Sequence, residues 1–584
     1  MSEPDDFYEP LDNIEDIDDF EAAVKRQNFT YSLSKEHPYT YWTLELYDQE
    51  NGIRGGGGLG VLAADTRRIA EQNDVPFVLL TPFYPEESHQ LMRDGKIIDT
   101  HNQVDYTSFG FHFVDSINIH CNGTSCKLDI IEKKFKNTRI VSVTEPNFGE
   151  LYADTSGSDH RLYQEVSLGF GGYVALKRLG FKPAIMQLNE VATFFAALAR
   201  LDELVSNGMD FYEAMVYTRK HTLYTNHTLV QAAEAEFRRE QFERFVYPNL
   251  RTKPVKKWLD DKFNDGGTLK LSSVTIEIAE LRSGVSKLHA KVADYRDIAG
   301  NKVKFRSITN GIDMKKWVMP ALLEFYQENG ILDESLMPTE NYEDALETLD
   351  AAKIRAFKLA GRELLNETLA SRPDQNGQIL EFKPDDFIFD FKRRFVDYKR
   401  PDMPFADPKR LREILEPRNA HYILTGRIHT GDYKMMRKLD EILKIIKKDS
   451  YLNTHVHYIA DYDERLAFAL SVGSNVAINL PIIGLEACGT SWMKDVANLN
   501  LLISTHDGGV ADIANSYHLD VRDDGDDDYE DEVDMLYHQM LAAINIWDND
   551  FDLEYMIRLQ LSGYLPIISG TRMLKEYLDY LFSK

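Results

Sequence analysis

The sequence of 584 residues predicts an α/β protein with parallel sheets, and three observations lead to this class. Between Phe387 and Thr505, short apolar segments alternate with amphipathic ones, which is the pattern of successive strand–helix–strand units. Near residue 53, a run of glycines leads into a helical pattern. Two further apolar segments end in the polar pairs Asn189-Glu190 and Asn226-His227. Because open parallel sheets bind ligands at the carboxyl ends of strands, these pairs are candidate site residues.

The N-terminal elements place the glycine run between a strand and a helix. Residues 1–22 are acidic, which predicts a flexible arm or a capping helix, and Tyr39–Leu46 predicts a strand. The segment IRGGGGLGVLAADTRRIAEQ then predicts a glycine loop that opens a helix, where backbone N–H groups can approach a phosphate. Its spacing matches neither GxGxxG nor the P-loop, so a dinucleotide or a nucleoside triphosphate is not indicated. A flexible hinge is the alternative.

Apolar patterns predict the remaining elements as far as the middle of the chain. Strands are expected at 75–81, in short segments between 97 and 147, at 184–188, at 222–228, and before the turn Asn310-Gly311. Helices are expected at 164–178, at 192–204, in a region reaching about 263, from about 273 through His289, and across 320–372. A loop is expected at 371–384, where the composition turns to Ser, Pro, Asp, Asn and Gly.

A dense basic cluster follows the strand predicted at 387–391. The chain carries a formal net charge of −28, which argues against a nucleic-acid partner. Five cations nevertheless fall within the nine residues 392–400, namely Lys392, Arg393, Arg394, Lys399 and Arg400. A solvated helix turn would explain them, but their place after a buried strand favours an anion site.

A single lysine, Lys494, stands among small and apolar residues in the segment LEACGTSWMKDVANLN, residues 485–500. Gly489, Thr490 and Ser491 before it offer backbone and hydroxyl donors to an anion. A lysine in such surroundings is a candidate for a lowered pKa and for attachment of an aldehyde. The alternative is a surface lysine in the first turn of a helix. Beyond it, 521–534 predicts a charged loop, and helices are expected at 534–547 and 572–582.

The cysteine content and the hydropathy pattern predict a cytoplasmic protein. Three cysteines are too few for a disulfide framework in a chain of this length. Cys121 and Cys126 lack a second pair to complete a metal site, so no metal is expected. The N-terminus lacks the features of a signal peptide, and no apolar run is long enough to span a membrane.

Taken in order, these motifs resemble those of the α-glucan phosphorylases, the family of glycogen, starch and maltodextrin phosphorylases. The resemblance is to the short form without a long regulatory extension. It runs from Tyr41 to Asp512 through GGLGVLAAD, QLNE, YTNHT, GVSKLH, TNGI with KKW, RRxxxYKR, YDERLA and EACGTSWMK. It implies two Rossmann-like lobes of GT-B type with the active site in the cleft between them. The lobes would span 1–315 and 316–555, and a helical segment, 556–584, would pack back on the first.

The resemblance also implies pyridoxal 5′-phosphate, bound as a Schiff base on Lys494, with its phosphate acting in acid–base chemistry beside the substrate phosphate. The implied catalytic residues are Lys494, Arg394, Lys399 and His227. Arg394 and Lys399 would hold the substrate phosphate with the backbone of Gly58. The cofactor would contact Lys494, Arg393, Thr490, Gly57, Gly58, Tyr47, Trp317 and Tyr462. The glucosyl unit would contact His227, Asn310, Glu486, Cys488 and Gly489.

The function implied is phosphorolysis of an α-1,4-glucan by inorganic phosphate, giving α-D-glucose 1-phosphate with retention. A homodimer is expected from the resemblance alone. A nucleotide-sugar glycosyltransferase of the same architecture is one alternative, and it would need no aldehyde cofactor. A hydrolase that pairs the carboxylates of Glu190 and Glu486 is another, but it leaves the basic cluster unexplained.

Four departures from the family's motifs motivate a third alternative, a non-catalytic glucan-binding homologue. Val191-Ala192 replaces the Gly-His that usually follows Asn-Glu. Trp492 stands two positions before Lys494, where a small or amide residue is usual. Cys488 replaces a serine, and Asn498-Leu499 replaces an Asn-Gly turn. The bulky indole is expected to reshape the cofactor pocket.

Overall fold

The computed structural model describes residues 32–51, 53–55, 57–93, 95–151, 154, 156–229, 235–292, 296, 301–521 and 529–582. The arm predicted at 1–22, Gly52, Gly56 and half of the charge run at 521–534, residues 522–528, lie outside these residues.

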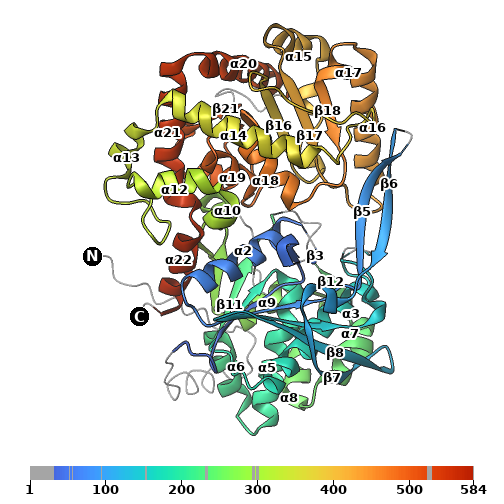
Figure 1. Ribbon diagram of the computed structural model, residues 1–584. Helices are drawn as coiled ribbons and strands as arrows, with labels where there is room; N and C mark the ends of the chain where they lie inside the picture. Colours follow the sequence, from blue (N-terminus) through green and yellow to red (C-terminus); the bar gives the residue numbers. More distant parts are fainter. Residues whose placement is uncertain are drawn as a thin grey trace.

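The N-terminal half of the described chain is built on a nine-stranded sheet of order β15-β14-β11-β10-β1-β4-β9-β8-β7 (Figure 1). The strands from β15 to β9 pair in parallel, while β8 pairs antiparallel with both β9 and β7. The bounds are β1 Tyr39–Trp42, β4 Phe77–Pro82, β7 His112–Cys121, β8 Thr124–Lys134, β9 Thr138–Thr144, β10 Ile185–Asn189, β11 Thr222–Asn226, β14 Leu281–Gly284 and β15 Arg306–Ser307.

The C-terminal half is built on a six-stranded sheet of order β18-β17-β16-β19-β20-β21 among the described residues, and every neighbouring pair is parallel. The bounds are β16 Ile388–Lys392, β17 His421–Thr425, β18 Val456–Ile459, β19 Val476–Asn479, β20 Leu501–Ser504 and β21 Leu519–Asp520. The alternation predicted between 387 and 505 is therefore confirmed, and so is the α/β class.

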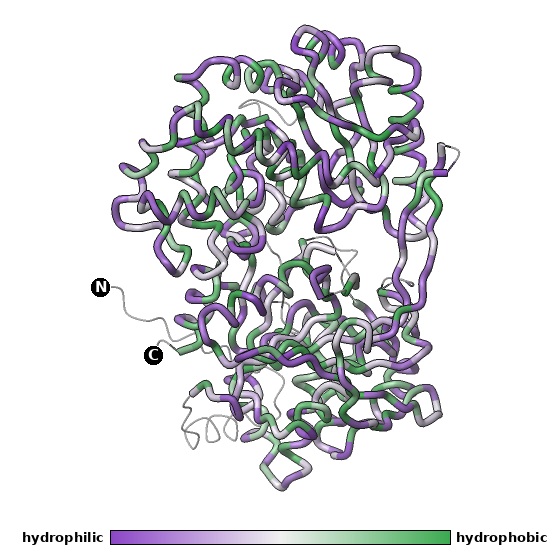
Figure 2. The backbone as a smooth tube through the Cα atoms, viewed as in Figure 1, coloured by the Kyte–Doolittle hydropathy of each residue, from purple (hydrophilic) through white to green (hydrophobic). Residues whose placement is uncertain are grey.

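Helices surround both sheets, and along their tubes hydrophilic and hydrophobic residues alternate as amphipathic helices require (Figures 1 and 2). In the N-terminal half they are α2 Gly58–Gln72, α3 Asp159–Val166, α4 Gly172–Arg178, α5 Phe194–Ser206, α6 Phe211–Lys220, α7 Arg239–Phe245, α8 Lys253–Asp260, α9 Leu271–Ile278 and α10 Lys287–Val292. Further on they are α11 Met314–Trp317, α12 Pro320–Glu328, α13 Tyr342–Ala345, α14 Ala351–Leu369, α15 Pro408–Leu415, α16 Tyr433–Lys448, α17 Leu452–His455, α18 Glu464–Gly473, α19 Ser491–Ala497, α20 Tyr529–Asp548, α21 Asp550–Ile568 and α22 Gly570–Phe582.

Two antiparallel hairpins, β2 Leu46–Asp48 with β3 Ile53–Gly55 and β5 Glu86–Arg93 with β6 Lys96–Gln103, complete the described strands together with a separate antiparallel pair, β12 Glu236–Arg238 with β13 Thr268–Lys270. The hairpin β5–β6 stands upright beside the two halves in Figure 1 and reaches from one to the other.

Three sequence predictions were wrong in detail. The strand expected at 39–46 ends at Trp42 and gives way to the separate strand β2. The helix expected from 273 through 289 is interrupted, because Leu281–Gly284 leaves α9 and becomes β14, paired with β11. The helical segment expected at 556–584 begins earlier and is divided, because α21 runs from Asp550 to Ile568 and α22 from Gly570 to Phe582.

The chain crosses between the halves at two adjacent places. Ile312 donates its backbone N–H to the carbonyl of Ile568 over 2.9 Å and accepts from Gly570 N over 2.9 Å. Helix α22 then lies against α2, and its residues Met573 and Tyr577 are buried in the same core cluster as Tyr39 of β1. The boundaries expected at 315/316 and 555/556 fall inside α11 and α21.

No helix in the described part of the chain is long and apolar enough to cross a membrane.

Candidate active site

Lys494 lies on the short helix α19 and is 5% exposed. Its ammonium nitrogen is 3.2 Å from the centroid of the Trp317 ring. Burial lowers the pKa of Lys494 to about 8, although the carboxylates of Asp65, Glu464 and Asp495 oppose that shift. Among the described residues it forms no ion pair. A buried amine with a lowered pKa is a suitable nucleophile for an aldehyde.

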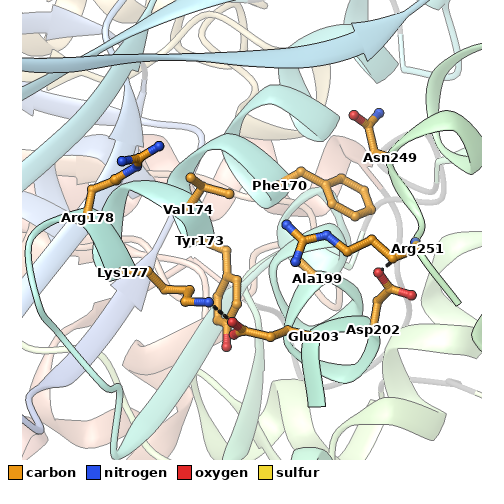
Figure 3. A pocket seen from close by; sticks show the side chains of 10 residues that line it. All are labelled: Phe170, Tyr173, Val174, Lys177, Arg178, Ala199, Asp202, Glu203, Asn249 and Arg251. Atoms are coloured by element: carbon orange, nitrogen blue, oxygen red, sulfur yellow. Dashed lines mark hydrogen bonds and ion pairs between the residues drawn. The ribbon is translucent and has the colours of Figure 1, made fainter. Parts of the chain in front are cut away.

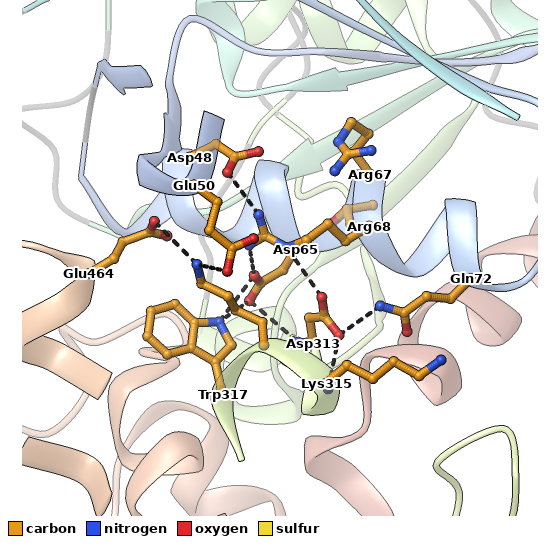
Figure 4. Close-up of polar contacts among 12 residues, drawn as sticks. Asp48, Glu50, Asp65, Arg67, Arg68, Gln72, Asp313, Lys315, Trp317 and Glu464 are labelled. Atoms are coloured by element: carbon orange, nitrogen blue, oxygen red, sulfur yellow. Dashed lines mark hydrogen bonds and ion pairs between the residues drawn. The ribbon is translucent and has the colours of Figure 1, made fainter. Parts of the chain in front are cut away.

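A carboxylate from the other half of the chain holds the indole beneath this lysine. Asp65 of α2 accepts from Trp317 Nε1 at 2.9 and 3.1 Å, one distance to each oxygen. Arg68, one turn further along α2, bonds Asp65 at 2.6 Å, Asp48 at 3.1 Å and Asp313 at 3.2 Å (Figure 4). Burial opposes the charge of Arg68, but these three carboxylates raise its pKa. The network ties the helix after the glycine loop to the residues around Lys494.

Arg393 is buried, and its Nη1 has no hydrogen-bond partner among the described residues. The atom lies 3.3 Å from the point where a Cβ on Gly489 would stand. Burial lowers the pKa of Arg393, and Glu486 opposes this. A buried guanidinium donor without an acceptor is costly, so the position is suited to an anion supplied by a ligand.

Arg394 faces the glycine loop from the opposite half of the chain. Its Nη1 lies 3.4 Å from the point where a Cβ on Gly57 would stand. The carboxylate of Glu45 lies 3.7 Å from the same point and accepts from Gly57 N at 2.7 Å and from Gly60 N at 3.3 Å. These N–H groups open helix α2, so the loop already binds one carboxylate beside the Arg394 guanidinium.

Lys399 and Glu486 form an ion pair of 3.0 Å, with both side chains largely buried. Asn310 lies nearby and donates Nδ2 to the carbonyl oxygen of Cys488 at 3.1 Å. Its Oδ1 is buried without a hydrogen-bond partner in the described part of the chain. Burial also raises the pKa of the Cys488 thiol, so this cysteine is an uncharged wall residue.

His227 follows strand β11, and Asn189 sets its tautomer. The amide nitrogen of Asn189 donates to the carbonyl of Trp42 at 2.9 Å, which leaves its oxygen 2.9 Å from His227 Nε2. That nitrogen therefore donates, and Nδ1 carries the free lone pair. Burial, with His289 beside it, lowers the pKa of His227 to about 3, so the ring is neutral.

Glu190 adopts a strained backbone, with φ of 65° and ψ of 159°. Its carboxylate accepts from His227 N at 2.9 Å and from the Thr228 hydroxyl at 2.8 Å, which holds the segment after β11. Burial raises the pKa of Glu190 to about 7. The predicted polar pairs at the ends of β10 and β11 are therefore in direct contact.

The remaining predicted residues surround the same region. Thr490 is the N-cap residue of α19, and Tyr47 is buried on β2. Burial raises the pKa of Tyr462. Asp495 and Tyr47 raise this pKa further, and Arg393 opposes the shift. Gly58 opens α2 with nothing within 4 Å of its Cβ position, so its backbone is approachable.

The sequence did not predict how several charged residues around this site are paired. Lys392, the first cation of the basic cluster, does not face a ligand, because it forms a buried ion pair of 2.8 Å with Asp390 and a second with Asp495. Arg400 likewise pairs with Glu532. Glu45 and Asp65 gave no signal, since their partners come from distant segments.

Two departures from the family's motifs have structural explanations. Trp492 leaves α19 away from Lys494 and packs edge-on against Tyr564 of α21, with ring centroids 4.9 Å apart. The indole is therefore packed toward α21, and its effect on the pocket stays a prediction. Leu499 has φ of 67°, so the residue that replaces glycine keeps the left-handed backbone while its side chain is fully buried.

A pocket of about 300 Å³ lies elsewhere, between α4, α5 and the segment 249–251, and contains none of the predicted site residues (Figure 3). Its Lys177 pairs with Glu203, and the carboxylate of Asp202 accepts from Arg251 N at 2.9 Å. Within the described residues, no group of three His, Cys, Asp or Glu side chains is placed to hold a metal ion.

Comparison with known proteins identifies related sequences. The model of the family described as carbohydrate phosphorylase matches residues 181–576. The maltodextrin phosphorylase of Thermococcus litoralis is 25% identical, over 100% of this chain and 75% of its own length. The glycogen phosphorylase of Mycobacterium tuberculosis is 25% identical, over 93% of this chain and 70% of its own length. An uncharacterized protein of Methanocaldococcus jannaschii is 24% identical, over 93% of this chain and 99% of its own length.

Proposed function

The chain belongs to the carbohydrate phosphorylase family, and from this premise we propose that it is a pyridoxal-phosphate-dependent α-1,4-glucan phosphorylase. It would release α-D-glucose 1-phosphate from a glycogen-like or maltodextrin chain, with retention at the anomeric carbon. The two sheets with their helices would form the two lobes of a GT-B fold, with the reaction in the cleft between them. We also propose a cytoplasmic location and a homodimer.

One observation carries the proposal most strongly. A buried guanidinium nitrogen of Arg393, without a partner in the described chain, lies beside Gly489, just before the helix that carries a buried lysine of lowered pKa. This combination fits an aldehyde that also bears a phosphate. Pyridoxal phosphate would attach at Lys494, and its phosphate would contact Arg393 and Thr490. When bound, the cofactor would supply a phosphate group for acid–base chemistry.

The substrate phosphate would bind between the two halves of the chain. Arg394 offers a planar fork to phosphate oxygens, and Lys399 supplies a point charge. The backbone N–H of Gly58, at the positive end of helix α2, would complete the phosphate site. Lys399 already balances Glu486, so their ion pair would loosen when a phosphate approaches.

The glucosyl unit would bind beside these groups. His227 would accept from a sugar hydroxyl through Nδ1, because its Nε2 is engaged by Asn189. Asn310 would use its unpartnered Oδ1 as a second acceptor, next to the carbonyl of Cys488. Tyr47, Trp317 and Tyr462 would exclude water from the cofactor.

A phosphorolysis assay with maltodextrins of graded length tests the proposal. Wild-type protein reconstituted with pyridoxal phosphate should release α-glucose 1-phosphate, and Lys494→Ala should lose both activity and cofactor retained after dialysis. Lys494→Arg is the matched control, since it keeps a cation but offers no primary amine. Equal rates in wild type and Lys494→Ala would refute the cofactor assignment.

Other outcomes would favour the alternatives. Turnover of a nucleotide sugar by protein that retains no pyridoxal phosphate would indicate a glycosyltransferase of another kind. Cofactor absorbance and glucan binding without release of glucose 1-phosphate would indicate a non-catalytic homologue. Ala192, in place of a histidine, is the departure that still favours this last outcome.

A further inference from the structure

His429 contacts the side chain proposed to bind the substrate phosphate. Its Nε2 lies 3.0 Å from Arg394 Nη1. A guanidinium can only donate, so the imidazole nitrogen accepts and must be unprotonated. Burial lowers the pKa of His429 to about 4, helped by Arg394 and Arg427 and opposed by Asp432. The neutral ring therefore orients the guanidinium without offering it a competing negative charge.

The loop that carries His429 is attached to the segment after β16 that carries Arg394. Phe395 donates its backbone N–H to the carbonyl of Arg427 at 2.9 Å, and it forms a parallel bridge with Ile428. Two short chain segments, 393–395 and 427–429, therefore run side by side. The side chains of Arg394 and His429, one from each segment, contact each other next to this bridge.

The same loop is held from the N-terminal half by the hairpin β5–β6. The Gln90 amide donates Nε2 to the carbonyl of Ile428 at 2.8 Å and accepts from Ile428 N at 2.9 Å. Gln90 is 2% exposed and Ile428 is fully buried. One side chain thus pairs with both backbone groups of the residue before His429, as a neighbouring strand would.

Two further contacts hold the hairpin at this place. Arg427 donates to the hydroxyl of Ser88, and His89 Nδ1 lies 3.1 Å from Asp461 Oδ2. The three successive hairpin residues 88–90 therefore contact the C-terminal half. In Figure 1 the hairpin spans the side of the molecule between the two sheets.

We propose that His429, held by Gln90 of the hairpin β5–β6, is a positioning residue that orients Arg394 for the phosphate substrate. This rests on the proposed function, in which Arg394 binds that phosphate. A guanidinium on a long flexible side chain binds an anion well only when its direction is set in advance, because otherwise binding must order it. The hairpin would thus make the phosphate site depend on both halves of the chain.

A kinetic test distinguishes an effect on phosphate binding from an effect on glucan binding. His429→Phe keeps the ring volume but removes the acceptor, and should raise KM for inorganic phosphate roughly tenfold while KM for maltodextrin stays within about twofold. His429→Gln, whose Oε1 can replace Nε2 as an acceptor, should restore most of the phosphate affinity. A purely structural role would move both KM values together or neither.

A second measurement does not need turnover. Calorimetric titration of the purified holoprotein with inorganic phosphate should show the same tenfold weakening in His429→Phe. Gln90→Ala should weaken phosphate binding in the same direction, and the double variant should be less than additive, because both act through one loop. Gln103→Ala is the matched control on the hairpin, since its amide donates to Glu86 of the same hairpin at 2.6 Å.

The outcomes distinguish this inference from the proposed function. Wild-type protein that binds phosphate but does not cleave glucan would refute the function and still allow the comparison of variants. Equal phosphate affinity in wild type and His429→Phe would overturn the positioning role alone. Wild-type protein that binds no phosphate would overturn both. If His429→Phe is unfolded, the result from Gln90→Ala decides.

Discussion

Trp492 and Lys494 are two positions apart on α19, and in a helix that spacing directs side chains to nearly opposite sides. The indole is 1% exposed and belongs to the core that α21 covers. We therefore predict that Trp492→Ala lowers the free energy of unfolding by about 3–5 kcal/mol. Cofactor bound per folded molecule should be unchanged, since the ring does not face Lys494.

Urea denaturation and cofactor absorbance check this prediction, with Trp492→Phe as a control that keeps an aromatic contact to Tyr564. Lost cofactor in a variant of unaltered stability would mean that the indole shapes the pocket after all.

The pKa of Glu190 predicts a specific dependence of stability on pH. The pKa is about 4.5 in the unfolded chain and about 7 in the folded protein. The folded state therefore binds this proton more tightly, so its contribution is complete below pH 4.5 and is lost as the pH rises through 7. Because the residue is only half-buried, we expect a loss of about 2 kcal/mol between pH 4.5 and pH 8.

Glu190→Gln keeps an acceptor for His227 N and the Thr228 hydroxyl but cannot ionise. The difference in unfolding free energy between wild type and this variant should shrink toward acid pH and grow toward alkaline pH, with the variant the more stable at pH 8. A difference that does not change with pH would contradict the assignment.

Single site residues were predictable where the residue itself stands in an unusual local sequence pattern. Lys494, Arg393, Arg394 and Lys399 gave a signal because lysine among small residues and dense cations in an acidic chain are unusual locally. Glu45 and His429 gave none, because a carboxylate or an imidazole acquires its meaning only from a partner far away in sequence.

At the scale of elements, a buried charge cluster aligns the basic segment with the lysine helix. Lys392 ends β16 and pairs with Asp390 on the same strand and with Asp495 of α19, all three side chains being at most 2% exposed. Burial opposes the charge of Lys392, but the two carboxylates raise its pKa. This cluster fixes the residue next to Arg393 against the residue next to Lys494.

We predict that Lys392→Met lowers the free energy of unfolding by about 3–5 kcal/mol, because it leaves two buried carboxylates without a cation. Thermal or urea denaturation measures the loss. Lys409→Met is the matched control: its side chain is 85% exposed in a pair with Glu413, so the change should stay within about 0.5 kcal/mol. Similar values for the two variants would show that the buried cluster contributes little.

Elements with a strong local pattern were predictable, and those set by tertiary pairing were not. The strands of the C-terminal sheet are mostly apolar, as buried parallel strands require, although β16 also carries Asp390 and Lys392. Leu281–Gly284 lacks such a run, and its pairing with β11 and β15 makes it a strand. Helix α21 contains Pro566, and a proline locally disfavours a helix. The helix nevertheless continues to Ile568, and buried residues such as Leu565 flank the proline.

At the scale of the whole molecule, the order of motifs predicted the α/β class but not how the halves meet. The contacts between them come from short loops and single side chains: Asn310 with Cys488, Ser286 with Ala487, and Gln90 with Ile428. No local periodicity marks such contacts. The hairpin β5–β6 shows this most clearly, since β5 was not predicted and yet links the two sheets.

His89 gives this link a pH dependence that can be measured. Its ring lies between two carboxylates, with Nδ1 3.1 Å from Asp461 and Nε2 3.1 Å from Glu87. Hydrogen bonds to Asp461 and Glu87 raise the pKa of His89 to about 9, although burial opposes this. The unfolded value is near 6.5, so the stabilisation is complete below pH 6.5 and is lost as the pH rises through 9.

We predict that the contact between the hairpin and the C-terminal half weakens by about 1 kcal/mol between pH 6.5 and pH 9.5, a value reduced for partial exposure. Amide hydrogen exchange in residues 86–103 and 427–429 should therefore quicken over this range, after correction for the intrinsic rate. His89→Gln cannot carry the charge, so its protection should start lower and change little with pH. Equal pH dependence in both proteins would mean that Gln90, rather than the imidazolium, holds the two halves together here.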